Sequence, residues 1–337
     1  MYTDFLIREI FSCNLPDTVT TVFIGGGTPS SLPLREMEKL LSAINSLPLS
    51  SDVEVTVECN PKTVSPDYLK LLNEQNVNRL SFGVQTTIDS ELKNISRQHT
   101  YADFLDNYEA ARQVGFANIN VDLMFNLPGQ TAGGFSVGLK KVIALSPEHI
   151  SCYSLTPAEN TPLWNDLRDG RISLPDDETD RLMYHTAKEL LKDSGYTHYE
   201  ISNFCKPGFF CRHNVDLWQY KPYIGFGLGA HSFDGAGRWN NPTTFDDYFG
   251  RKGHNEQELT TAEMRAEAVI LALRLTDGFF EDEFCMIHGF RPSVLYADKL
   301  QELAKKGLIH HSNKRIALTP LGLDLANQVF LHFLSEE

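Results

Sequence analysis

Five short apolar segments alternate with helix-like segments through the first half of this sequence. The apolar segments cover residues 21–24, 53–57, 79–84, 119–124 and 149–155. The helix-like segments between them cover residues 34–46, 66–74, 89–95 with 101–115, and 133–145. Strands that alternate with helices are typical of parallel strands joined by right-handed crossovers. Because the strands are mostly apolar, the pattern predicts either a closed or partly closed barrel or a doubly wound sheet.

Polar residues near the ends of these strands favour the barrel. Residues 25–28, 58–60, Gln85 and Thr156 each follow a strand, and Asp122 lies inside the fourth. A barrel gathers all its strand ends at one mouth, whereas a doubly wound sheet concentrates its polar ends at one switch point. We therefore predict an α/β fold containing a partial (β/α) barrel. The sequence begins on a helix-like run, so we expect this barrel to lack its first strand.

The pattern changes after about residue 157. An amphipathic helix is predicted over residues 176–195, with a glycine at its C-cap. Residues 300–307 then read as a helix end, 308–319 as a two-stranded wing and 320–334 as a last helix, which together indicate a winged helix. We expect three regions: the partial barrel over 1–160, a sheet and loop extension over 161–255, and a winged-helix-like domain over 256–337.

The charge balance argues against a nucleic-acid partner. The net charge is −14, and residues 260–337 carry eight Lys and Arg against eleven Asp and Glu. Nucleic-acid binding needs basic surface that displaces phosphate counterions. The sequence also has no apolar stretch near 20 residues and no N-terminal signal pattern. We predict a cytoplasmic protein without a membrane span, which leaves peripheral membrane contact open.

The six cysteines are scattered along the chain at Cys13, Cys59, Cys152, Cys205, Cys211 and Cys285. No two of them have the spacing of a C-x-x-C or C-x-x-x-C pair, which makes a zinc ribbon or a cluster on neighbouring thiolates unexpected. We predict reduced thiols and no metal site within this sequence.

Three glycines, at positions 25–27, end the first apolar segment and precede Thr28. Glycine tolerates positive φ and lets backbone come close to a ligand. Ligands of α/β folds lie at such strand ends. The alternative is a plain tight turn between strand and helix, because a single glycine-rich loop is a weak signal.

Three later residues have side chains suited to a polar ligand. Glu58 can accept hydrogen bonds from an ammonium or hydroxyls, and Gln85 can donate and accept at once. Arg97 offers a planar fork suited to a carboxylate. Each also has a plain alternative as a solvated residue at the end of a strand or helix.

Asp122 is flanked by apolar residues, where an unpaired carboxylate is costly to bury. Either it faces the barrel interior and binds something polar, or it pairs with a neighbouring base. The ligand-facing position is the stronger interpretation.

Two histidines in the second half are candidates for a different ligand. His213 follows Cys211, and a histidine or cysteine there could ligate a haem iron. A structural, hydrogen-bonded histidine is the equal alternative. His231 is a second and weaker candidate.

Taken in order, these motifs resemble the radical S-adenosylmethionine superfamily. They are most similar to its branch of oxygen-independent coproporphyrinogen III oxidase-like proteins, which act largely as haem chaperones. The resemblance covers nearly the whole sequence. It is carried by residues 25–30, 58–61, 81–85, 97–99, 120–124, 127–130, 199–203, 211–214 and 227–232.

The resemblance implies a cofactor site for S-adenosylmethionine at seven positions. Gly26, Gly27 and Thr28 would meet the methionine amine, and Arg97 would pair with its carboxylate. Asp122 would accept from a ribose hydroxyl. Glu58 and Gln85 would hold polar groups nearby.

The resemblance also implies haem binding at residues 211–214, with His213 as the tentative ligand. The family's motif continues to Tyr-Trp, whereas here Leu217 stands before Trp218. This departure weakens the assignment of His213.

A larger departure concerns the iron–sulfur cluster. The family carries C-x-x-x-C-x-x-C after its first strand, where three thiolates hold a 4Fe–4S cluster. This sequence begins after that point and lacks the motif. We expect truncation rather than gradual decay of the site, and no cluster on this chain.

The resemblance therefore implies a haem chaperone that delivers haem to an acceptor protein, rather than an enzyme with the coproporphyrinogen dehydrogenase activity. The alternatives are oxygen-independent coproporphyrinogen III oxidase and a nucleic-acid-binding module.

Overall fold

The computed structural model describes residues 1–250 and 252–334, which divide into two compact units. One unit comprises residues 15–198 and 202–210 and is called here the sheet unit. The other comprises residues 1–14, 199–201 and the described residues from Cys211 onward, and is called the C-terminal unit.

A curved, seven-stranded sheet is the centre of the fold, in the order β1-β2-β3-β4-β5-β7-β6. Its first five strands are parallel, and β7 runs antiparallel to β5. The predicted partial barrel is therefore confirmed, with β1 at one edge of the sheet. The strands are β1 (Val19–Ile24), β2 (Leu49–Cys59), β3 (Arg79–Gln85), β4 (Ile119–Phe125), β5 (His149–Ser154), β6 (Thr197–Glu200) and β7 (Asn203–Cys205).

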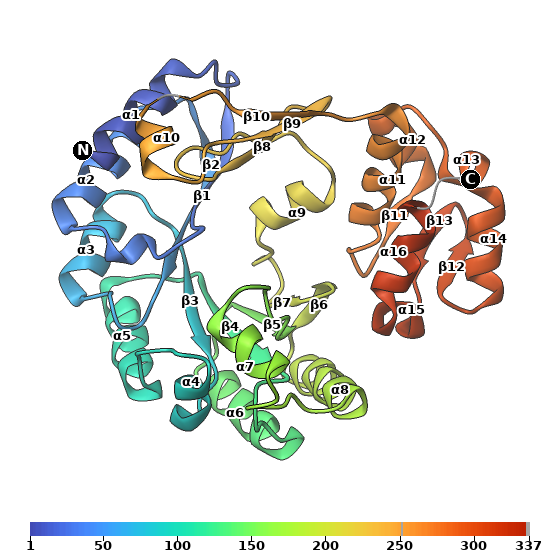
Figure 1. Cartoon of the computed structure of the whole chain (residues 1–337), viewed down its shortest axis with the longest axis horizontal. Helices are drawn as coiled ribbons and strands as arrows, with labels where there is room; N and C mark the ends of the chain where they lie inside the picture. The colour runs from blue at the N-terminus through green and yellow to red at the C-terminus, as the bar shows by residue number, and fades with distance from the viewer. Residues whose placement is uncertain (251, 335–337) are drawn as a thin grey trace. The chain divides into compact units, whose positions relative to one another are not determined.

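Crossover helices cover the outer face of these strands (Figure 1). Buried side chains such as Leu40 and Leu41 line the inner side of α2, while its exposed positions after Leu34 are polar. Phe82 of β3 meets Phe104 of α5 edge to face, with ring centroids 5.8 Å apart. These helices are α2 (Leu34–Ile44), α3 (Pro66–Glu74), α4 (Asp89–Asn94), α5 (Tyr101–Val114), α6 (Ala132–Ala144) and α8 (Asp177–Asp193). The unit also contains α7 (Pro162–Arg168) and a short 3-10 helix at Pro29–Ser31.

The first helix, α1 (Tyr2–Ser12), belongs to the C-terminal unit. Its Glu9 carboxylate accepts hydrogen bonds from Gly227 N, Asn241 Nδ2 and Tyr248 Oη at 3.0, 2.6 and 2.5 Å. These three donors hold the loop at residue 227 against α1. The neighbouring elements of this unit are α9 (Arg212–Trp218), β8 (His231–Phe233), β9 (Gly237–Asn240), α10 (Phe245–Phe249) and β10 (Asn255–Glu258).

The end of the chain forms the predicted winged helix. The wing is the antiparallel pair β12–β13, and β11 adds a third strand beside β13. The last helix is broken in two at Leu325, where the expected helix over 320–334 was continuous. The elements are α11 (Thr261–Ala272), β11 (Phe279–Phe280), α12 (Glu281–His288), α13 (Pro292–Leu295), α14 (Ala297–Lys305), β12 (Ile309–Ser312), β13 (Arg315–Leu318), α15 (Pro320–Asp324) and α16 (Ala326–Leu334).

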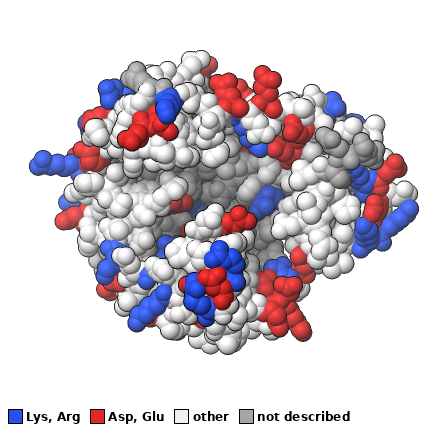
Figure 2. Space-filling model, viewed as in Figure 1, with Lys and Arg blue, Asp and Glu red and all other residues white. Residues whose placement is uncertain are grey.

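Figure 2 shows acidic and basic side chains interspersed over the face in view, with no broad basic area among its coloured residues. Within residues 1–250 and 252–334, no helix combines the length and apolar character needed to cross a bilayer.

Candidate functional site

Two rows of polar residues cross the concave face of the sheet, from the carboxyl end of β2 to the first half of β5. Paired residues of neighbouring parallel strands point to the same face. One row is Glu58, Ser81, Asn120 and His149, and the next is Gly83, Asp122 and Ser151. Alternate β4 residues, Val121, Leu123 and Phe125, are buried on the opposite face. Tertiary pairing thus gathers polar side chains from four strands.

Asp122 is held by its neighbours in these rows. Its Oδ1 accepts from Asn120 Nδ2 at 2.7 Å and its Oδ2 from Ser81 Oγ at 3.3 Å. Burial raises the pKa of the Asp122 carboxyl, while hydrogen bonds from Ser151 and Asn120 and the Arg79 charge oppose that rise. Asp122 therefore lies on the concave face, where its hydrogen-bond partners are neutral donors rather than a base.

Glu58 connects the concave face to the glycine loop. Its Oε2 accepts from the backbone N–H of Gly26 at 3.2 Å, where Gly26 has φ +85°. A Cβ on Gly25 would lie 2.8 Å from the Glu58 carboxyl carbon, so only glycine permits this approach. Burial and the Asp122 charge raise the pKa of Glu58. The loop is thus positioned by a site carboxylate, while Gly27 and Thr28 remain exposed beside it.

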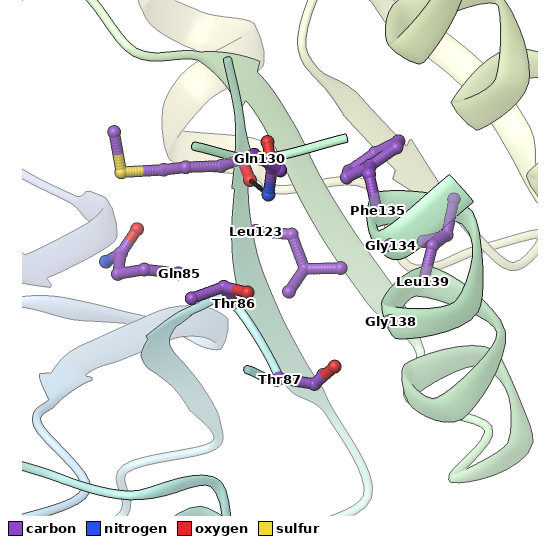
Figure 3. Close-up of a pocket in the computed structure, with 10 residues that line it drawn as sticks. Gln85, Thr86, Thr87, Leu123, Gln130, Gly134, Phe135, Gly138 and Leu139 are labelled. Carbon is purple, nitrogen blue, oxygen red and sulfur yellow. Dashed lines mark hydrogen bonds between the residues drawn. The ribbon is translucent and has the colours of Figure 1, made fainter. Parts of the chain in front are cut away.

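Gln85 ends β3 in a left-handed conformation, with φ +68° beside an irregularity in the β3–β4 register. The next residues are held by a buried network in which Thr86 Oγ1 donates to Glu91 Oε2 at 2.5 Å and Gln130 Nε2 to the same oxygen at 3.1 Å. A small cavity lies behind this turn, against α6. Figure 3 shows the Gln85 side chain directed away from Phe135 and Leu139 of that cavity.

Arg97 follows α4 and is partly buried. In the part of the chain that the structure describes, its guanidinium makes no hydrogen bond or ion pair. A partly buried, unpaired guanidinium can bind an anion from outside the chain.

Tyr153 of β5 lies near the residues that the sequence predicts for the site. Its hydroxyl donates to Gln85 Oε1 at 3.3 Å. Burial and the carboxylates of Asp122 and Glu58 raise its pKa, whereas the Arg97 charge opposes that rise. Tyr153 therefore contacts Gln85 of β3 directly, and the charges of Glu58, Asp122 and Arg97 lie near enough to affect its pKa. The expected set of Glu58, Gln85, Arg97 and Asp122 lies together in the sheet unit.

Sequence reasoning missed the residues that support this set, namely Ser81, Asn120, His149, Ser151 and Tyr153. A usable signal was present, because Asn120 and Asp122 alternate with apolar residues along one strand, as do His149, Ser151 and Tyr153 along the next.

His213 lies in the C-terminal unit, at the second position of α9, and is partly buried. Its unit differs from that of the polar rows.

The residues present fit S-adenosylmethionine but not an iron–sulfur cluster. The glycine loop, two interior carboxylates and an unpaired arginine match the polar groups of the nucleotide. For a cluster, no group of three or more His, Cys, Asp and Glu within the described residues is arranged to hold a metal. Burial raises the pKa of the Cys59 and Cys152 thiols, which disfavours the thiolates that ligate iron.

Comparison with known proteins decides the family. Residues 3–135 match the family model of the radical SAM superfamily, and residues 259–325 match that of the HemN C-terminal domain. The heme chaperone HemW of Bacillus subtilis is 41% identical over 98% of this chain and 89% of its own length. The HemW of Escherichia coli is 32% identical over 94% of this chain and 85% of its own.

The chain belongs to the HemW family.

A solved structure shows the same fold as this member of the HemW family. Coproporphyrinogen III oxidase (HemN) from Escherichia coli, described as a radical SAM enzyme, superposes with a TM-score of 0.83. It covers 98% of this chain and 82% of its own, at 22% identity. At 22% identity, this likeness shows the fold alone.

Proposed function

We propose that this chain is a haem chaperone, which binds haem and passes it to an acceptor protein. The observation that carries the proposal is the 41% identity with a heme chaperone over 98% of the chain. The alternative activity, that of coproporphyrinogen III oxidase, is supported only by a similar fold at 22% sequence identity. We therefore do not expect porphyrin decarboxylation. A cytoplasmic location and peripheral membrane contact remain predictions.

We further propose that the concave face of the sheet binds S-adenosylmethionine. Arg97 would pair with the carboxylate of the methionine part, and the Gly26 and Gly27 carbonyls with Thr28 would accept from its amine. Asp122 would accept from a ribose hydroxyl, and Glu58 and Gln85 would hold polar groups between them. When bound, the sulfonium nucleotide would supply a reducible carbon–sulfur bond. The support is the unpaired guanidinium of Arg97 and the two carboxylates held on one face.

The haem site is proposed at the start of α9, with His213 as an iron ligand. Haemin titration of the purified chain tests it by the absorbance of the bound pigment. We expect His213→Ala to weaken binding, and His310→Ala, on the exposed wing strand, to leave it unchanged. Haem binding that persists fully in His213→Ala would refute this ligand. A chain that binds no haem at all would refute the chaperone proposal.

A further inference from the structure

Tyr153 is a half-buried aromatic residue of the candidate site. It lies two residues after Ser151 on β5 and pairs with Met124 of β4. Its side chain therefore points to the concave face, on the side where Asp122 points. Tyr153 thus belongs to the same surface as the proposed ligand contacts.

The Tyr153 hydroxyl donates a hydrogen bond to the oxygen of the Gln85 side-chain amide. The Tyr153 Oη and Gln85 Oε1 atoms of this hydrogen bond are 3.3 Å apart. Gln85 Nε2 lies 3.1 Å from the position that a Cβ on Gly83 would take. In the described part of the chain, Nε2 makes no hydrogen bond. The amide is left with its two N–H donors toward Gly83, where the missing side chain leaves room.

The protonation state of Tyr153 suits this role. Burial and the carboxylates of Asp122 and Glu58 raise its pKa, so the hydroxyl keeps its proton at neutral pH. A protonated hydroxyl donates to Gln85 and still has lone pairs that can accept from the ligand.

We propose that Tyr153 is a further S-adenosylmethionine-contacting residue, and that its hydroxyl turns the Gln85 amide so that Nε2 donates to an acceptor atom of the nucleotide. This inference rests on the proposed S-adenosylmethionine site. It adds a polar contact from β5 to those from β2, β3, β4 and Arg97. A ligand without an acceptor opposite Gln85 would leave that amide unpaired and would bind less tightly.

A double-mutant cycle on Tyr153→Phe and Gln85→Ala tests the proposal. S-adenosylmethionine binding is measured by calorimetry on the wild-type chain, both single variants and the double variant. We expect Tyr153→Phe, which keeps the ring, to weaken binding about fivefold to tenfold. Because Tyr153 acts partly through Gln85, the two effects should be less than additive.

The matched control is Tyr101→Phe on α5, whose ring packs near Lys141 outside the site and whose loss of hydroxyl should leave binding unchanged. Thermal unfolding of each variant separates a loss of fold from a loss of contact. Wild-type affinity in Tyr153→Phe, or strictly additive effects, would overturn this inference alone. Absence of binding by the wild-type chain would overturn the S-adenosylmethionine site and this inference together.

Discussion

Asn120 Nδ2 lies 2.7 Å from Oδ1 of Asp122, two residues further along the same strand. The same amide nitrogen donates to Ser81 Oγ at 2.8 Å, and its Oδ1 lies 2.6 Å from Nδ1 of His149. Burial lowers the pKa of His149 well below its usual value, so this ring is neutral. One asparagine thus connects three strands and presents donors to the carboxylate. These hydrogen bonds favour the ionised form of Asp122 and so oppose the rise in its pKa that burial causes.

Replacing Asn120 by aspartate should weaken S-adenosylmethionine binding at neutral pH by about tenfold or more. The new carboxyl would face Asp122 across a hydrogen-bond distance, so one of the two must hold a proton. The measurement is affinity as a function of pH. Wild-type affinity should fall on acidification, because protonation removes an acceptor, and the raised pKa of Asp122 places that fall above the ordinary carboxyl range. In Asn120→Asp the fall should move to higher pH.

The control for this pH profile is Asn14→Asp, an exposed change with the same chemistry. A profile for Asn120→Asp that coincides with the wild-type profile would rule out Asp122 as a charged ligand contact.

Replacing Arg97 by alanine should reduce S-adenosylmethionine affinity about tenfold to a hundredfold, since a charge-assisted hydrogen bond contributes about 1.5–3 kcal/mol. The melting temperature should hardly change, because the guanidinium has no hydrogen bond or ion pair with any described residue. Arg97→Lys should recover only part of the affinity, because an ammonium cannot bind a carboxylate through two parallel N–H groups. Calorimetry and thermal unfolding give the two readouts. Equal affinity in all three chains would contradict a carboxylate contact.

A methyl group on Gly25 should displace the Glu58 side chain from Gly26. The added Cβ would lie 2.8 Å from the Glu58 carboxyl carbon and 2.7 Å from a Phe23 ring carbon. We expect Gly25→Ala to lower both the melting temperature and the affinity for S-adenosylmethionine. Gly133→Ala near the start of α6 is the matched control, because nothing lies within 4 Å of its Cβ and alanine favours the helix. An unchanged Gly25→Ala variant would show that the loop adjusts freely.

Replacing Glu9 by alanine should destabilise the C-terminal unit by about 2–4 kcal/mol, because three donors lose one acceptor. Thermal unfolding followed by circular dichroism measures the shift. Glu109→Ala, an exposed carboxylate on α5, should shift the transition by at most about 0.5 kcal/mol. If the two variants melt alike, the contacts of Glu9 contribute nothing net to stability.

Much of the fold could be predicted because it depends on local pattern. The run from Val55 to Val57 and the apolar spacing of α2 specify a buried strand and an amphipathic helix without reference to the rest of the chain. The break at Leu325 was not predictable in this way, because the apolar pattern runs through both helices. The expected division at residues 160 and 255 stays a prediction. The two compact units could not be predicted from local pattern, because α1 joins the C-terminal unit through Glu9, whose hydrogen-bond partners lie more than 200 residues away in the sequence.

By itself, the sequence determined the alternation of strands and helices, the residue types at the strand ends, including Glu58 and Gln85, and the carboxylate of Asp122 within an apolar strand. Only the tertiary structure decided which of their neighbours share the concave face, which atoms of Asp122 are already occupied, and that Tyr153 orients Gln85. The physical reason is that apolar periodicity can be recognised within about ten consecutive residues. The hydrogen bond between Tyr153 and Gln85, 68 residues apart, depends instead on strand register and on a left-handed turn that no local pattern encodes.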